Sequence, residues 1–382
     1  MREFLFCIFT TEKFSQIGSS GGSDSECEEF GLPGKFFNGG AVLSKTTRVL
    51  FAVVACAFVV TQATAQDEFK PSVSVGGGLR AGVSFGDDAD NYGLNNTRLY
   101  INASAASWLS LEVNSETSFG GETDLPSGDE LGVTLLDAVA KISLSDNADV
   151  WVGRFLAPSD RANLSGPYYG NVGNNGLASA SSYYMGGNKQ AGRDDGVMLT
   201  GGLPTGGVNL KYSIGIFDGG ADDDQMIAAR VVLNLWDDEP GYYNASTYFG
   251  EKEIFAIGVS FQSDSDGGAG GGGNEDASEV DLLVEKNLDM GTVTLDAAYY
   301  DNDSEENPYS VFVGLLLGNE IAIGPMSGKP RPYVSISDTG IDDEFSLGVQ
   351  YVIDGHKANL SVEYSDSDLG GSTFGIGAQF QF

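Results

Sequence analysis

The last ten residues of the chain alternate strictly between apolar and other positions. One face of this extended segment carries Phe374, Ile376, Ala378, Phe380 and Phe382, and the opposite face carries threonine, glycine and glutamine. At the edge of a soluble sheet, such a strand would expose a flat apolar surface. In the wall of a membrane barrel, the same strand contacts lipid with one face and water with the other. The pattern therefore predicts a barrel-wall strand.

Similar alternating segments of about ten residues recur from Pro71 onward, which is the length that a tilted strand needs to cross a bilayer. They predict an all-β fold, a transmembrane antiparallel β-barrel of about 16 strands. The predicted strands lie at 71–86, 96–106, 108–119, 131–145, 147–156, 193–203, 206–218, 225–236, 252–263, 277–288, 291–302, 308–318, 330–338, 344–353, 357–366 and 372–382.

The connections between these strands alternate in length. Tight turns follow several even-numbered strands, whereas longer, acidic and glycine-rich loops follow the odd-numbered ones. An up-and-down barrel with both ends of its chain in the periplasm requires this arrangement. Two connections on the tight-turn side, 237–251 and 319–329, are longer than the rule predicts.

The first 65 residues do not share the strand pattern. Residues 1–44 show no periodicity and are predicted to be an over-extended, unstructured N-terminus. Residues 45–65 combine a basic start, an apolar centre and the small-residue site Ala63-Thr64-Ala65, which is typical of a cleavable signal peptide. A lipoprotein processing site at Cys56 is the alternative, although the apolar run continues past it. The barrel is assigned to residues 66–382, exported to the cell outer membrane.

Composition narrows the chemistry. The 382 residues contain 20 Lys or Arg and 54 Asp or Glu, a net charge of −34, which excludes a basic nucleic-acid interface. All three cysteines, Cys7, Cys27 and Cys56, precede the predicted cleavage site, so the mature chain has neither disulfides nor thiolate metal ligands. No cofactor and no metal site are predicted. The acidic loops are interpreted as solvated, with bridging divalent cations as the alternative.

The connection at 157–192, between the fifth and sixth strands, is the longest. A loop of this length in a compact fold is usually functional or disordered, and its tyrosines and few charges favour packing. In a wide barrel the place to pack is the lumen. The sequence therefore predicts a constriction loop after strand 5 that narrows the pore and selects solutes.

Several segments resemble one family, the outer-membrane porins grouped as phosphate-selective porins O and P. The resemblance lies in VGRFLAPSDR (152–161), GPYYG (166–170), GRDDGV (192–197), PGYY (240–243), STYFG (246–250), YVIDGHK (351–357) and the terminal Phe382. It implies a sixteen-stranded barrel, commonly trimeric, through which small solutes diffuse. The candidate pore and constriction-loop residues are Arg154, Asp160, Arg161, Tyr168, Tyr169, Arg193 and Asp194.

Strand parity predicts which basic residues face the lumen, namely Arg80, Arg98, Lys141, Lys211, Arg230 and Arg331. Anion-selective members of the family line the pore with such residues. Residues 1–65 hold five Lys or Arg and six Asp or Glu, so the mature chain keeps only 15 basic residues against 48 acidic ones. The inward cations either form a local anion path or pair with inward carboxylates, for which the candidates are Glu112, Glu116, Asp281, Glu285 and Glu363.

Aromatic residues give a separate signal, because rings with a polar edge collect at membrane boundaries. A membrane girdle is predicted at Trp108, Trp151, Trp236 and Phe382. The alternative is that aromatic residues are enriched in any strand.

These patterns favour an outer-membrane porin, a water-filled channel for passive diffusion of small hydrophilic solutes, with anions such as phosphate among them. A non-conducting structural or adhesive barrel whose acidic loops bind a partner is the alternative, and a secreted soluble β-protein is a third. An enzyme is not predicted, because the only histidine, His356, falls in a tight turn where a solvated role is expected. The predicted partners are outer-membrane lipid and lipopolysaccharide, the barrel-insertion machinery acting on the C-terminal strand, and two further copies in a homotrimer.

Overall fold

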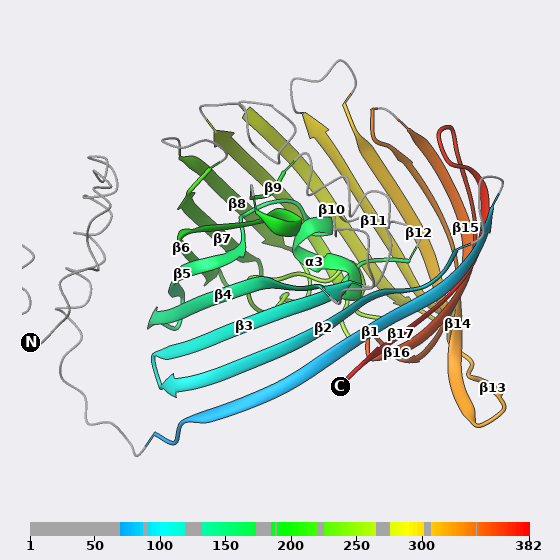
Figure 1. The fold of residues 1–382 in the computed structure, drawn as a ribbon, viewed down its shortest axis with the longest axis horizontal. Helices are drawn as coiled ribbons and strands as arrows, with labels where there is room; N and C mark the ends of the chain where they lie inside the picture. Colours follow the sequence, from blue (N-terminus) through cyan, green and yellow to red (C-terminus); the bar gives the residue numbers. More distant parts are fainter. Residues whose placement is uncertain are drawn as a thin grey trace, which may run out of the picture. The chain divides into compact units, whose positions relative to one another are not determined.

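Residues 66–382 form one compact unit, a closed antiparallel β-barrel (Figure 1). The computed structural model describes residues 69–86, 91–118, 132–172, 185–187, 189–219, 225–264, 276–301, 307–340 and 342–382. The predicted N-terminal extension, the signal peptide and much of the acidic outer loops lie outside these residues.

The strands follow one another around the barrel, each pairing with its sequence neighbours. Sixteen of the seventeen strands form the wall, because the short β13 pairs with β14 alone. The bounds are β1 Ser72–Gly86, β2 Asn91–Ala106, β3 Leu109–Ser118, β4 Gly132–Ser145, β5 Ala148–Leu156, β6 Arg193–Pro204, β7 Asn209–Phe217, β8 Met226–Asn234, β9 Ile254–Asp264, β10 Asp276–Leu288, β11 Gly291–Asp301, β12 Tyr309–Leu317, β13 Ile321–Ile323, β14 Met326–Asp338, β15 Asp343–Asp354, β16 Ala358–Ser367 and β17 Gly371–Gln381.

The first and last strands close the barrel. β1 pairs antiparallel with β17 from Gly78 opposite Gln381 to Gly86 opposite Thr373. Past the end of β17, Gly77 and Phe382 exchange two backbone hydrogen bonds of 3.1 and 3.0 Å. Closure leaves the wall without a free edge. The predicted antiparallel barrel of sixteen strands is confirmed.

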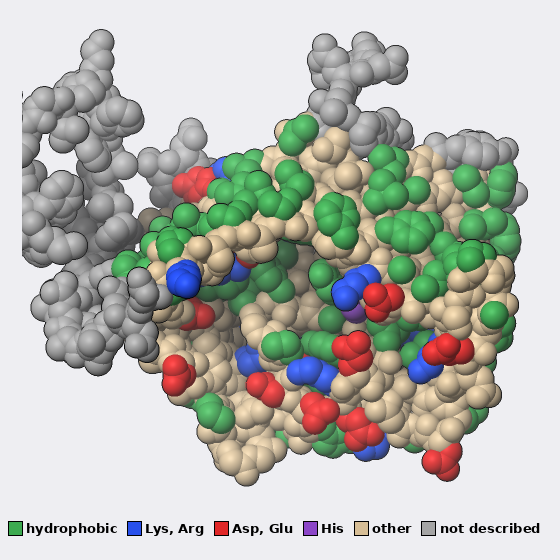
Figure 2. Space-filling view, turned by 90° about the horizontal axis from the view of Figure 1, so that it is seen from below, with side chains coloured by type: hydrophobic (Ala, Val, Ile, Leu, Met, Phe, Trp, Pro, Cys, Tyr) green, Lys and Arg blue, Asp and Glu red, His purple; other side chains and the backbone are tan. Residues whose placement is uncertain are grey.

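In the wall, apolar side chains are exposed and polar side chains are buried, which is the reverse of a soluble protein. In β8, Ile227 and Val231 are 45% and 44% exposed, whereas the alternate residues Ala228 and Arg230 are 0% and 3% exposed. The same alternation recurs in the other strands, with aliphatic side chains outside and Asp, Glu, Ser, Gln and Arg inside. Figure 2 shows charged side chains gathered around a hollow of the barrel. An apolar exterior around a polar interior is typical of a barrel that crosses a membrane.

The two connections that are too long for tight turns have different structures. Residues 319–329 extend a hairpin, in which Ile321 pairs with Gly328 and Ile323 pairs with Met326, and this hairpin projects beyond the neighbouring strands (Figure 1). β14 therefore begins at Met326 rather than at the predicted residue 330. Residues 237–251 instead enter the barrel, where Glu239, Tyr242 and residues 244–247 are buried and contact residues inside it.

Helix is scarce in the described part of the chain. It contains α3 (Arg161–Tyr169) and the short η3 (Gln190–Gly192), both in the connection between β5 and β6. Within the residues described, no helix has the length and apolar character needed to cross a membrane.

Candidate functional site

α3 lies inside the ring of strands (Figure 1). Asp160 caps its N-terminus by accepting a hydrogen bond of 3.2 Å from the backbone N–H of Asn163. The helix is irregular at Gly166, whose φ of 59° is in the left-handed region, and the next residue is Pro167. α3 is therefore a short helix with a kink at Gly166.

The connection that carries α3 reaches several parts of the inner wall. Tyr300 of β11 donates to the Asp160 carboxylate over 2.8 Å, and Gln262 of β9 donates to the carbonyl of Pro158 over 2.8 Å. On the other side, the Tyr168 hydroxyl donates to the carbonyl of Asn96 in β2 over 3.3 Å, and Gln379 of β17 donates to the Tyr168 carbonyl over 2.9 Å. The connection therefore spans the lumen from β9 and β11 to β17 and β2.

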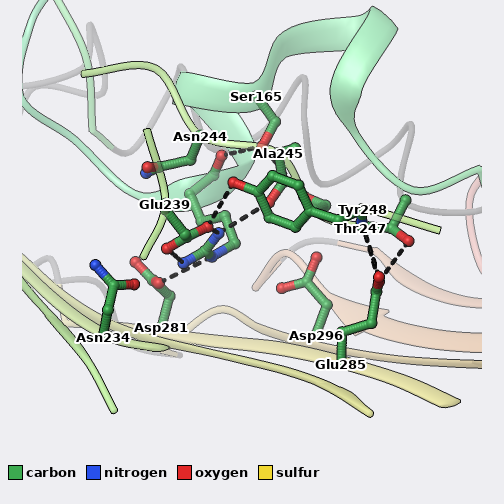
Figure 3. A network of polar contacts seen from close by, with 12 residues as sticks. Ser165, Asn234, Glu239, Asn244, Ala245, Thr247, Tyr248, Asp281, Glu285 and Asp296 are labelled. Atoms are coloured by element: carbon green, nitrogen blue, oxygen red, sulfur yellow. Dashed lines mark hydrogen bonds and ion pairs between the residues drawn. The ribbon is translucent and has the colours of Figure 1, made fainter. Parts of the chain in front are cut away.

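The connection between β8 and β9 also enters the lumen. We call residues 237–251 the short-side insertion, because they lie on the side of the tight turns. Ser246 donates its backbone N–H to the Tyr169 carbonyl over 2.9 Å, and Asn171 donates to the Ser246 carbonyl over 3.0 Å. The Ser165 and Ser246 hydroxyls are 3.2 Å apart. Two segments from opposite ends of the barrel thus meet inside it (Figure 3).

Glu285 of β10 holds the short-side insertion against the wall. Its carboxylate accepts hydrogen bonds from the Thr247 hydroxyl at 2.7 Å and from the backbone N–H groups of Tyr248 and Gly250 at 3.1 and 2.8 Å. The Thr294 hydroxyl donates to the same carboxylate over 3.1 Å. A buried carboxylate with several donors is well satisfied, so this contact fixes the insertion to the strand.

Arg161 joins the two inserted segments and the wall. Its guanidinium donates to both carboxylate oxygens of Glu239 at 2.6 and 2.9 Å, and to the Ala245 carbonyl at 2.8 Å. Asp281 of β10 accepts a further bond at 3.3 Å. Arg161 is only 1% exposed. Although burial raises the pKa of the Glu239 carboxyl, the adjacent guanidinium outweighs this effect and holds that pKa below its usual value.

Three of the predicted inward cations have carboxylate partners. Arg98 contacts Glu116 at 2.5 Å, Lys141 pairs with Glu112, and Arg230 contacts Asp281 at 2.6 Å. Arg331 instead donates to Asn171 at 2.9 Å and packs between the rings of Phe249 and Phe312. Carboxylate pairing describes the first three of these residues, and Arg331 has amide and aromatic partners instead.

The loop candidates have different environments. Arg193 is buried and contacts Asp137 at 3.2 Å, and Asp194 beside it is fully buried. Tyr168 is 1% exposed, whereas Tyr169 is 44% exposed. The structure brings Asp160, Arg161, Tyr168 and Tyr169 together in the lumen.

Two candidate residues of β5 lie on the face of the wall opposite to the one predicted. Trp151 does not face lipid, because it is 5% exposed and packs its ring against those of Tyr242 and Tyr243 inside the barrel. Arg154 lies outside the lumen, on the same face of β5 as the exposed Val152, where it forms a half-exposed pair with Asp195. Trp108 and Trp236, at 42% and 41% exposure, and Phe382, at 88%, do lie on the exterior.

One side of the wall is less covered than the other. Inward residues of β8, β9 and β10 are mostly buried beneath the inserted segments. Inward residues of β16, β17 and β1 are mostly half-exposed instead. Arg80 of β1 and Arg98 of β2 belong to this more open side. The inner wall is therefore more accessible to water on this side.

Sequence reasoning gave no site role to Glu239, Asn244 or Thr247 of the short-side insertion. The signals that could have located them are the excess length of their connection and the PGYY (240–243) and STYFG (246–250) segments, which were noted only for their family resemblance. Nothing in the strand pattern indicates that this segment turns inward, because its contacts are with residues remote in sequence.

His356 is not solvated but links the same two segments. Its Nδ1 lies 3.0 Å from the Tyr168 carbonyl and its Nε2 lies 2.8 Å from the Thr247 carbonyl. Its ring also packs against Tyr169 and Phe249, with ring centroids 5.0 and 4.8 Å apart. Burial lowers the pKa of His356 to about 4, although both carbonyls oppose the shift.

The lowered pKa of His356 predicts a pH dependence. Between pH 6.5 and 4 the unfolded chain binds this proton and the folded chain does not, so stability should fall as the pH falls, by at most about 1.4 kcal/mol per pH unit. Burial raises the pKa of Asp160 to about 6, which gives the opposite slope below pH 6. The measurement is therefore a difference, the unfolding temperature of the wild type minus that of His356→Gln from pH 7 to 4. A difference that does not shrink toward low pH would contradict the assignment.

The fold is a closed barrel of sixteen strands with a polar, partly filled lumen. No protein-family profile matches the chain, and none of the curated proteins matches it. Among solved structures, the barrel is similar to an anion-selective porin from Comamonas acidovorans, with a TM-score of 0.51 and 16% identity over 82% of this chain and 100% of that one. It is also similar to a mutant form of the Rh. blastica porin, with a TM-score of 0.50 and 17% identity over 81% of this chain and 100% of that one. At such identity the likeness establishes the porin fold, and the resemblance to the phosphate-selective porins stays a prediction.

Proposed function

We propose that the protein is an outer-membrane porin, a water-filled channel through which small hydrophilic solutes diffuse passively. The observation that carries this proposal is the inverted barrel, whose lumen is polar and whose wall stays half-exposed along β16, β17 and β1. The two inserted segments leave this side of the lumen more open and thereby act as the constriction. A channel is favoured over an enzyme, because both ring nitrogens of the only histidine, His356, are occupied by backbone carbonyls.

Conductance in planar bilayers tests the proposal. Purified protein that shows heat-modifiable migration, and so is folded, should produce discrete current steps. Silence from folded protein would support the alternative, a non-conducting structural or adhesive barrel. Loss of heat-modifiable migration would instead indicate a soluble β-protein.

We further propose a modest charge preference set by Arg80 and Arg98, which lie on the more open side. Arg98 is balanced by Glu116, so the passage lacks the row of free cations that strong selection for anions such as phosphate needs. Replacing both arginines with glutamine should raise the potassium-to-chloride permeability ratio roughly twofold or more. The reversal potential in a salt gradient measures this ratio. Arg154→Gln, on the outer face, is the matched control and should leave it unchanged.

We also propose the assembly that the porin class suggests, a homotrimer in contact with outer-membrane lipid and lipopolysaccharide. The exterior supports it, because Phe374, Ile376 and Phe380 of β17 are 44%, 46% and 45% exposed. The same exposed strand, ending at Phe382, is the proposed signal for the barrel-insertion machinery.

A further inference from the structure

A cleft of about 420 Å³ opens where the short-side insertion meets the wall of β5, β6 and β7. We call it the short-turn cleft, because the β4–β5 turn forms part of its rim. Its wall carries Asp149, Trp151 and Lys211, and the insertion contributes Asp238 and Tyr242. A volume of this size is within the range of small-molecule sites, roughly 300–1,000 Å³.

Hydrogen-bond donors without acceptors belong to residues of the cleft and of the recess beside it. The indole Nε1 of Trp151 is buried and has no hydrogen-bond partner among the described residues. Lys211 donates to Asn244 over 3.1 Å and, in the described part of the chain, forms no ion pair. The amide nitrogen of Asn244, in a recess that shares Lys211 and Tyr242 with the cleft, is also buried without an acceptor. Buried donors of this kind are costly unless a ligand or water meets them.

Carboxylates line the same cleft. Asp146 and Asp238 are exposed at its rim, and Asp149 is half-buried on the inward face of β5. Glu239 also lines the cleft, but its carboxylate is already bound to Arg161. The cleft is therefore lined by the Lys211 ammonium group, which has two donors left after its bond to Asn244, and by the carboxylates of Asp146, Asp149 and Asp238, of which Asp238 accepts a hydrogen bond from Asn234 at 3.4 Å.

This arrangement of charges disfavours small ions that carry a single charge. A small anion that approached Lys211 would pass the carboxylates of Asp149 and Asp238, and a small cation would meet the Lys211 ammonium group. A sugar would lack a stacking platform, since Lys141 lies 3.9 Å from the centre of the Trp151 ring and Tyr242 covers its edge at 5.0 Å. A molecule that carries a negative and a positive charge a short distance apart can contact both the Lys211 ammonium group and the carboxylates.

We propose that the short-turn cleft binds a small zwitterion of the amino-acid type, with its carboxylate at Lys211 and Trp151 and its ammonium group at Asp149. That this molecule is a solute in transit rests on the proposed channel function. The site would hold the solute at the tight-turn mouth of the passage, beside the short-side insertion.

Calorimetric titration of the folded, detergent-solubilised barrel tests the site with three probes: alanine, acetate and ethylamine. Alanine should bind at least tenfold more tightly than either singly charged fragment. Lys211→Met and Asp149→Asn should each weaken alanine binding at least tenfold, and Trp151→Phe, which keeps a ring but removes the donor, should weaken it less. Lys357→Met removes one exposed charge from a tight turn on the same side and should leave binding unchanged.

Acetate binding as tight as that of alanine, or no alanine binding by protein with heat-modifiable migration, would overturn the proposed site. Conductance of the same preparations separates this result from failure of the channel. Current steps without alanine binding overturn the site and leave the channel intact. Alanine binding without current supports the site and overturns the channel.

Discussion

Replacing Arg161 with alanine should both destabilise the barrel and raise its single-channel conductance. The substitution leaves Glu239 and Asp281, which are 1% exposed each, as buried carboxylates without this partner. Breaking a buried ion pair in this way costs about 3–5 kcal/mol. The cost falls mainly on Glu239, which, among residues that the structure describes, would keep only a hydrogen bond from the Tyr248 hydroxyl, whereas Asp281 would keep Arg230 at 2.6 Å. Release of the short-side insertion would relieve the cost, and the lumen would widen. We expect conductance to rise roughly twofold or more.

The matched control for Arg161→Ala is Arg154→Ala. Arg154 also forms an arginine–carboxylate pair, but the two side chains are 31% and 46% exposed, so its loss should cost less than about 1 kcal/mol. The temperature at which the folded band disappears on gels and the size of the current steps measure the two effects. A double-mutant cycle with Glu239→Gln should show coupling between the partners. If Arg161→Ala matched Arg154→Ala in both measurements, Arg161 would not be what holds the insertion.

Excision of the short-side insertion should give the largest change in conductance. In this variant, residues 238–252 are replaced by an Asn-Gly turn, which suits a two-residue hairpin because Asp237 lies opposite Glu253. Arg161→Met accompanies the deletion so that no unpaired guanidinium is left buried. β8 and β9 pair from Met226 opposite Asp264 to Asn234 opposite Ala256 without the insertion, so the wall should remain closed. We expect conductance to rise several-fold, as measured by single-channel recording.

The second over-long connection provides the control for this excision. Deleting residues 321–326 from the β13–β14 hairpin removes part of its excess length on the same side of the barrel, but these residues project away from the lumen. Conductance should therefore stay at the wild-type value. Equal conductance in the two deletion variants would show that the short-side insertion does not restrict the passage.

The sequence predicted the strands well because each strand reports its environment locally. Within one strand, alternate residues meet lipid and water, so a period of two identifies it without knowledge of its neighbours. β10 was expected at 277–288 and spans Asp276–Leu288, and the terminal strand was expected at 372–382 and spans Gly371–Gln381. β14 was misjudged by four residues, because the connection before it pairs as a hairpin that the strand pattern did not separate from a loop.

The candidate site was predicted only in part. Parity placed Arg98, Lys141 and Arg230 on the inward face, but it could not say which carboxylate each would meet. The girdle interpretation of Trp151 was wrong because aromatic residues favour membrane boundaries and packed interiors alike, and only strand parity separates the two. His356 was expected in solvent, since a turn in an ordinary barrel has nothing inside the lumen to contact.

By itself, the amino-acid sequence determined the architecture of this protein: a closed wall of alternating strands with apolar residues outside. Each strand contacts lipid with one face and the lumen with the other, so its alternating pattern can be recognised in the sequence without knowledge of any long-range contact. Only the tertiary structure decided how the lumen is filled. Arg161 meets Glu239 across 78 positions and His356 meets Tyr168 across 188. Such contacts depend on which segments closure of the barrel brings together, and no local periodicity records them.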